Sequence, residues 1–155
     1  MGALSGIGRA GRGLVLAAAL VLATAGAGQA DGPGKVSIRS GGTEHSFTVE
    51  VVDTPASREH GLMGRTALAP DHGMLFDFQV TEPVYFWMKN TPLPLDMIFI
   101  GRDLAIVRIE HSATPFSERV IPSGGPARYV LEVAGGTAKR LGLSPGDHVA
   151  LDIAP

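Results

Sequence analysis

Residues 84–100 read VYFWMKNTPLPLDMIFI, and this stretch decides the fold that the sequence predicts. The runs 84–88 and 95–100 are rich in large apolar and aromatic residues and lack glycine and proline, a pattern typical of buried strands. Pro92 and Pro94 lie between the runs, and each proline fixes its own φ and keeps the preceding residue out of the helical region. The sequence therefore predicts two strands joined by a stiff, extended link.

Three polar side chains, those of Lys89, Asn90 and Asp96, lie among these hydrophobic residues. A shielded carboxylate needs a donor or a cation, and Lys89 is the nearest cation in sequence, so we expect Lys89 and Asp96 to pair across the turn. In a second interpretation Trp87 is a stacking surface, and Lys89 and Asn90 donate hydrogen bonds to an anionic or sugar-like ligand. The sequence leaves both interpretations open.

The composition indicates one globular domain. The chain has 155 residues, of which 45% are hydrophobic, enough for a single domain with its own core. Cysteine is absent, which excludes disulfides, thiol nucleophiles and Cys-ligated zinc.

The N-terminal residues 1–30 have the pattern of a secretory signal peptide. Arg9 and Arg12 precede an apolar run at 14–25, which is too short to span a bilayer comfortably, and small residues follow it. We therefore expect a periplasmic or secreted domain comprising 31–155, with no stable membrane span after cleavage.

The charge of the expected mature chain disfavours some partners. Without the first 30 residues it carries 11 Lys and Arg against 15 Asp and Glu, a net charge of −4. A mildly acidic chain is a poor match for nucleic acid or for an anionic membrane surface.

Motifs for metal binding and covalent catalysis are missing from the sequence. The five histidines show neither His-x-His nor His-x-x-x-His spacing, and no Gly-x-Ser-x-Gly elbow is present. We therefore predict no metal and no other cofactor. The histidines are His45, His60, His72, His111 and His148.

Turn signals divide the rest of the chain into short strands. A threonine and a proline at 54–55 predict the start of a helix over 56–63, and a second helical turn is expected at 136–141. The glycine- and proline-rich segment 122–126 is expected to be a loop. Nine short strands with two small helices predict an all-β fold, a β-sandwich or small barrel. The seven strands outside the opening stretch are expected at 35–39, 45–53, 74–78, 104–111, 118–121, 128–133 and 148–153.

The motif FWMKNT at 86–91, followed by PLD at 94–96, resembles the signature of the bacterial and archaeal family called domain of unknown function 192. The resemblance extends over roughly 36–153. It implies a compact, jelly-roll-like β-sandwich and often an exported protein, but no reaction, because the family has no agreed activity. The other matching pieces are Arg58, 61–65, 73–76, 129–132, Gly136 and 146–147.

Two arginines could contribute to a site. Arginine forms a planar, bidentate fork suited to carboxylates and phosphates, so Arg58 and Arg65 could join Lys89 in a cationic pocket. Alternatively, the arginines could brace their helix to Asp96 and Glu132, since buried carboxylates need partners.

We favour a non-enzymatic module that binds a small polar ligand or a carboxylate of an envelope protein. A second hypothesis is an accessory domain in which the polar cluster is only scaffold. A third is an envelope hydrolase or lyase that uses Asp96 and Glu132 as an acid–base pair. The candidate binding residues are Trp87, Lys89, Asn90, Asp96, Arg58, Arg65 and Glu132.

Overall fold

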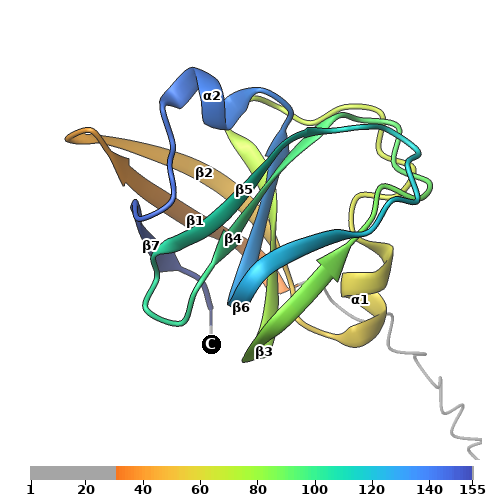
Figure 1. The fold of residues 1–155 in the computed structure, drawn as a ribbon, viewed down its shortest axis with the longest axis horizontal. Coiled ribbons are helices and arrows are strands. Elements are labelled where there is room, and N and C mark those ends of the chain that lie inside the picture. Colours follow the sequence, from red (N-terminus) through yellow and green to blue (C-terminus); the bar gives the residue numbers. More distant parts are fainter. Residues whose placement is uncertain (1–30, 155) are drawn as a thin grey trace, which may run out of the picture.

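The structure is a computed structural model that describes residues 31–154, so the signal peptide expected at 1–30 lies outside the described residues. Within that range no helix is long and apolar enough to cross a membrane. The elements follow one another as shown in Figure 1. They are β1 (Asp31–Ser40), β2 (Thr43–Val52), α1 (Pro55–His60), β3 (His72–Phe86), β4 (Leu95–Ile100), β5 (Ile106–Ala113), β6 (Ile121–Ala134), α2 (Thr137–Leu141) and β7 (His148–Asp152).

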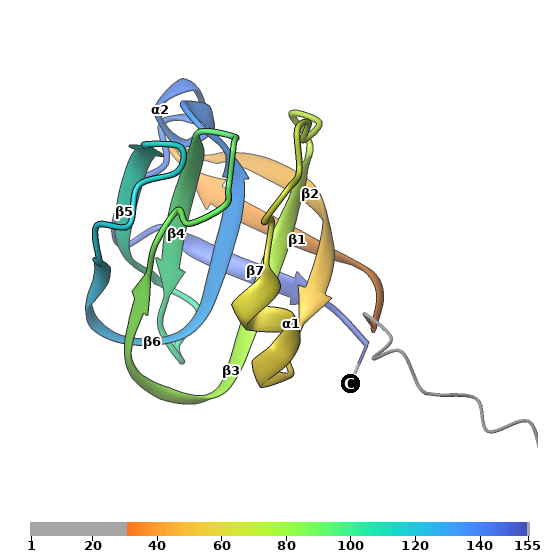
Figure 2. The same ribbon diagram turned by 90° about the vertical axis from the view of Figure 1, so that its right-hand side faces the viewer.

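The strands form one seven-stranded sheet in the order β5-β4-β6-β3-β2-β1-β7. The sheet curls, so that β1, β2 and β7 lie across β4, β5 and β6 (Figures 1 and 2). The two ends of the sheet approach each other, since Ala105 pairs with His148 and the Val149 N–H donates to the Leu104 carbonyl at 2.8 Å. The result is a half-barrel.

One pair of neighbouring strands, β2 and β3, is parallel, whereas the other pairs are antiparallel. Parallel neighbours need a crossover connection rather than a tight hairpin. Residues 53–71 supply this connection and include α1. Figure 2 shows α1 beside β3, at the opposite end of the sheet from α2. The topology thus places a short helix against the outer face of the sheet.

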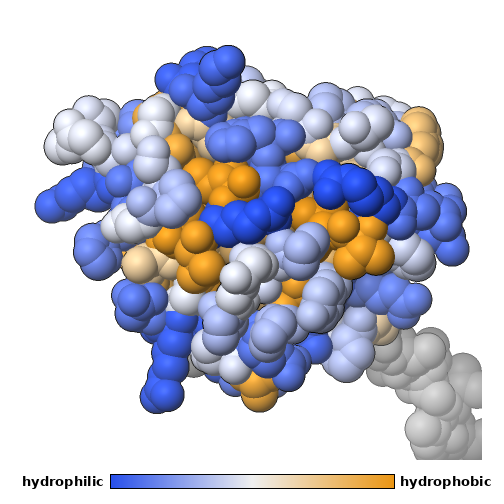
Figure 3. Space-filling model, viewed as in Figure 1, coloured by the Kyte–Doolittle hydropathy of each residue, from blue (hydrophilic) through white to orange (hydrophobic). Residues whose placement is uncertain are grey.

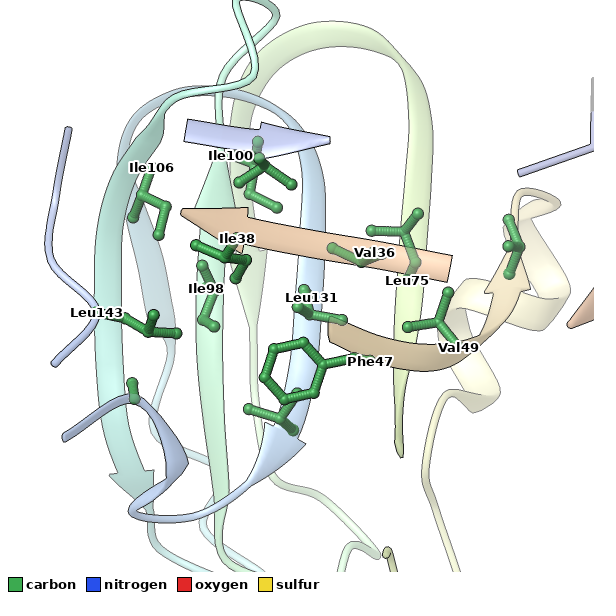
Figure 4. Close-up of a cluster of buried hydrophobic side chains, with 14 residues drawn as sticks. Val36, Ile38, Phe47, Val49, Leu75, Ile98, Ile100, Ile106, Leu131 and Leu143 are labelled. Atoms are coloured by element: carbon green, nitrogen blue, oxygen red, sulfur yellow. The ribbon is translucent and has the colours of Figure 1, made fainter. Parts of the chain in front are cut away.

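The interior of the half-barrel holds the first of two hydrophobic clusters (Figure 4). Alternate residues of each strand point inward, as Val36 and Ile38 do from β1, and both are fully buried. Burying a side chain of this size contributes about 1.5–3 kcal/mol. Other members of this cluster are Phe47, Val49, Leu75, Ile98, Ile100, Leu131, Val133, Leu143 and Val149.

The second cluster covers the outer face of β3, β4 and β6. Every residue of β4 is therefore buried, which explains why 95–100 is apolar without alternation except at Asp96. The helix α1 contributes no buried residue to this cluster, whereas Leu62, just after it, is buried. The cluster also contains Met74, Phe76, Val84, Met88, Met97, Phe99, Ile121 and Val130.

The helix α1 begins as predicted but is shorter. Thr54 is the N-cap, and its hydroxyl accepts a hydrogen bond from the Ser57 N–H at 3.1 Å. The expected end at Met63 is wrong, because Gly61 has a φ of 46° and ends the helix after His60.

The expected loop at 122–126 is wrong, because β6 runs through it. The strand β3 likewise joins the two strands expected at 74–78 and 84–88. Register irregularities along the β3–β6 pair accommodate its prolines, which are tolerated in strands at such positions. The buried Ser123 hydroxyl accepts a hydrogen bond from the Val84 N–H at 3.1 Å and so satisfies a donor of β3.

The fold is mainly β, with two short helices within the described range, as the sequence predicts. The barrel-like curvature also agrees with the prediction. The finer expectation of a jelly roll is not confirmed, since the strand order is that of one curled sheet.

Candidate functional site

Asp96 is fully buried on the face of β4 that points into the half-barrel. Its carboxylate accepts hydrogen bonds from the main-chain N–H groups of Ser112 at 2.7 Å, Gly136 at 3.0 Å and Ala138 at 2.7 Å. Charge-assisted bonds of this kind are stronger than neutral ones. Asp96 therefore fastens the end of β5 and the start of α2 to β4, and its expected pairing with Lys89 is wrong.

Lys89 instead lies over the indole of Trp87, with 4.9 Å between the ammonium nitrogen and the ring centroid. Among residues 31–154 no carboxylate forms a salt bridge with this ammonium. Trp87 is 42% exposed, whereas the neighbouring Met88 is fully buried, as the alternation predicts. Lys89 is thus a cation with open donor positions beside an exposed aromatic ring.

Replacing Lys89 with alanine is expected to lower the free energy of unfolding by less than about 1 kcal/mol, because only an exposed cation–π contact is lost. Its effect should add to that of Asp96→Asn within about 0.5 kcal/mol, since the two side chains share no contact. Urea denaturation of the parent, both single variants and the double variant measures the coupling. A strong coupling would contradict the separation of the two residues.

Asn90 shapes the link between β3 and β4. Its φ is 54°, a left-handed conformation that asparagine tolerates better than most residues. The Gly64 N–H donates to the Asn90 carbonyl at 2.8 Å, which ties the link to the turn that follows α1. Asn90 therefore helps to hold two segments together.

The two arginines have other partners than expected. Arg65 forms a bidentate pair with Glu50 at 2.7 and 2.5 Å, and this hydrogen bonding raises the pKa of Arg65. Arg58 donates to the main-chain carbonyls of Asp53 and Asp77 and lies over the ring of Phe78. The expected brace from the arginines to Asp96 and Glu132 is therefore wrong.

Glu132 is left as a buried carboxyl without a protein partner. It lies on the outer face of β6, directly between Met74 of β3 and Met97 of β4, and it is 4% exposed. Its main chain pairs with both neighbouring strands, but within residues 31–154 no hydrogen bond or salt bridge is made to its carboxyl oxygens. Desolvation by burial raises the pKa of Glu132 to about 8.

A cavity of about 310 Å³ adjoins this carboxyl, between α1, the end of β3 and the link that follows it. Glu132 and Thr91 are its most buried polar residues. The cavity combines aromatic walls with several polar and charged side chains, and its volume is in the range of small-ligand sites. Its walls are Pro55, Arg58, Glu59, His60, Gly61, Leu62, Met63, Phe76, Phe78, Tyr85, Phe86, Trp87 and Lys89.

The structure brings Trp87, Lys89, Arg58 and Glu132 to this cavity but not Asp96. Cross-strand partners share a face of a sheet; Asp96 is opposite Val133, so it lies on the other face from Glu132. The two carboxyl groups therefore do not form the acid–base pair that a hydrolase or lyase hypothesis requires. Arg65 is also absent from the cavity walls.

Sequence reasoning missed the aromatic wall of the cavity. The rings of Phe76 and Phe86 meet edge to face with centroids 5.1 Å apart, and Phe86 contacts Phe99 at 6.0 Å in the same way. The signal was available, since Phe76 and Phe78 share a face of one strand by alternation. Their proximity to α1 depends on the crossover, which the sequence pattern did not reveal.

Exposed apolar residues are found outside the cavity as well, among them Val80, Phe116 and Val120. On the face drawn in Figure 3, apolar surface occurs as separate areas divided by polar residues. In the described range no three histidine or acidic side chains are grouped so that they could hold a metal ion. The cavity at Glu132 is therefore the best candidate site.

Comparison with known proteins identifies the family. Residues 36–151 match the family model DUF192, described as "Uncharacterized ACR", and the chain belongs to this family. A search of curated proteins finds no match.

Solved structures similar to this chain include the following two. One is a protein from Sinorhizobium meliloti 1021 whose description proposes a transcription regulator. It is 50% identical, with a TM-score of 0.77 over 79% of this chain and 96% of the other. The second is a protein of unknown function from Novosphingobium aromaticivorans DSM 12444. It is 40% identical, with a TM-score of 0.73 over 75% of this chain and 83% of the other.

Proposed function

We propose that this protein is an exported, non-enzymatic module that binds a small polar ligand in the cavity beside α1. One observation carries the proposal: the carboxyl of Glu132 lines an aromatic cavity and has no partner within residues 31–154. A buried polar group without a hydrogen bond costs stability, and a ligand that supplies the missing partner offsets this cost.

The surroundings of Glu132 support a role in ligand binding rather than a purely structural role. The polar residue that does serve the scaffold, Asp96, is fully satisfied by main-chain donors. The carboxyl of Glu132, by contrast, has no partner within residues 31–154 and adjoins a cavity, and burial raises its pKa. A perturbed carboxyl in a concave site is a candidate functional group on physical grounds.

The proposal that the protein is exported rests on the signal-peptide pattern at 1–30. The proposed role of the S. meliloti protein in transcription regulation concerns that protein. For this chain, the net charge of −4 after removal of the leader disfavours nucleic acid as the ligand.

The test uses Trp87, the only tryptophan of the chain and part of the cavity wall, as a reporter. A library of small polar compounds is screened by thermal shift, and hits are titrated by tryptophan fluorescence. A ligand present at 100 times its Kd is expected to stabilise the parent by about 2.7 kcal/mol. The Trp87→Ala variant, tested by thermal shift alone, should lose most of this stabilisation.

The matched control is Phe116→Ala, since Phe116 is an exposed aromatic residue that does not line the cavity. It should respond to the hits as the parent does. Hits that stabilise both variants and parent equally would contradict binding in the cavity. A library without hits would favour the accessory-domain hypothesis.

A further inference from the structure

We infer that the cavity, within the binding function proposed above, takes a small organic anion with an apolar or aromatic body. Lys89 at the mouth of the cavity holds the anionic head. The protonated carboxyl of Glu132 donates a hydrogen bond to an acceptor atom of the ligand. This inference names the ligand class and rests on the proposed function.

The charges of the cavity favour an anion. Arg58 and Lys89 are two basic side chains on its wall, and Glu59 is the acidic residue there besides Glu132. Lys89 forms no salt bridge within residues 31–154, so its ammonium has donors available. Charges act strongly in a cavity with low-dielectric walls, and there Lys89 attracts an anion.

The chemistry of Glu132 favours an acceptor. Its neighbours on both adjacent strands are Met74 and Met97, which supply no strong donor that would stabilise a carboxylate. The pKa of about 8, which results from burial, keeps the group protonated at neutral pH. A protonated carboxyl donates one hydrogen bond, and a carbonyl or similar group of the ligand can accept that bond.

A cationic ligand matches the aromatic walls less well. Aromatic faces bind cations, but Arg58 already lies over Phe78 at 5.1 Å and Lys89 over Trp87 at 4.9 Å. These two ring faces are thus occupied by cations of the protein, which repel a second cation.

The experiment compares three probes of nearly the same shape: 4-acetylbenzoate, 4-acetylbenzamide and 4-acetylbenzamidine. Each presents the same carbonyl acceptor, while the opposite end is anionic, neutral or cationic. Isothermal titration calorimetry of the purified protein at pH 7 and pH 9, in buffers of different ionisation heat, gives both the affinity and the protons exchanged. The charged and titratable groups that line the cavity around Glu132 are Arg58, Glu59, His60, Tyr85 and Lys89.

At pH 7 the benzoate is expected to bind at least about tenfold more tightly than the benzamidine, since only the benzoate pairs with Lys89. At pH 9 its affinity should fall about tenfold and binding should take up a proton, because Glu132 must be protonated to donate. In Glu132→Gln the amide still donates, so this loss of affinity should disappear.

Lys89→Ala should weaken the affinity for the benzoate about tenfold and leave the affinity for the benzamide unchanged, because Lys89 pairs only with a charged head group. Lys139→Ala is the control, since Lys139 is an exposed lysine of α2 at the other end of the sheet. It should leave all three affinities unchanged.

Two groups of outcomes would overturn the inference. Tighter binding of the benzamidine with proton release, or equal binding of all three probes, rejects the anionic class but leaves the cavity as a binding site. Absence of binding by every probe also rejects the class. The proposed function itself then fails if the broader library gives no hits, or if its hits stabilise Trp87→Ala as much as the parent.

Discussion

Replacing Asp96 with alanine is expected to lower the free energy of unfolding by about 3 kcal/mol, since three main-chain N–H groups, one of them buried and two partly buried, lose the acceptor that the buried carboxylate supplies, at about 1 kcal/mol or more each. These donors belong to Ser112 at the end of β5 and to Gly136 and Ala138 at the start of α2, so the carboxylate joins both segments to β4. Urea denaturation followed by circular dichroism measures the change.

Asp103→Ala is the control, because Asp103 also accepts a main-chain hydrogen bond but is exposed and makes a longer contact of 3.3 Å with the Ala105 N–H. It should cost less than about 1 kcal/mol. An Asp96→Ala protein as stable as this control would show that the carboxylate is not the scaffold residue described above.

The second large effect is a loss of stability with rising pH that depends on Glu132. Its pKa is raised from 4.5 to about 8 in the folded state, so unfolding releases a proton between these values. Stability from this group is therefore fully present below pH 4.5 and declines as pH rises to about 8. The shift corresponds to a change on the order of 5 kcal/mol at most.

The Glu132→Gln variant lacks this titration, so its stability relative to the parent should increase steadily from pH 5 to pH 8. Urea denaturation at several pH values measures the difference. Glu118→Gln, an exposed substitution of the same kind, should follow the parent at each pH. Parallel profiles for the parent and Glu132→Gln would mean that the carboxyl is ionised in the folded protein.

The features that sequence predicted well depend on neighbouring residues. The helix start at Thr54 and the second helical turn, predicted at 136–141 and observed as α2, are each set by a few adjacent residues with defined backbone preferences. The family motif and the short apolar runs likewise indicated a mainly β fold.

The partners of Asp96 were not predictable in this way. Its donors lie 16, 40 and 42 residues further along the chain, and main-chain donors leave no side-chain pattern in a sequence. Lys89 was the nearest cation in sequence, but the chain turns it toward Trp87. A pairing inferred from proximity therefore failed, although the need of Asp96 for donors was inferred correctly.

The site around Glu132 was only partly predictable. Its place on an apolar strand was evident, and the sequence suggested an arginine partner. In the structure Arg65 pairs with Glu50, and Arg58 donates hydrogen bonds to main-chain carbonyls. Competition between several possible acceptors for one arginine is decided by the fold, and the sequence alone did not rank them.

The helix α1 contributes no buried residue. Its ends are set by the N-cap Thr54 and the C-cap Gly61. Its side chains nevertheless form one wall of the cavity. If the cavity binds the proposed ligand, substitutions on this helix are expected to alter selectivity without loosening either hydrophobic cluster. Its four residues that line the cavity, Pro55, Arg58, Glu59 and His60, are therefore the natural positions for a designed library.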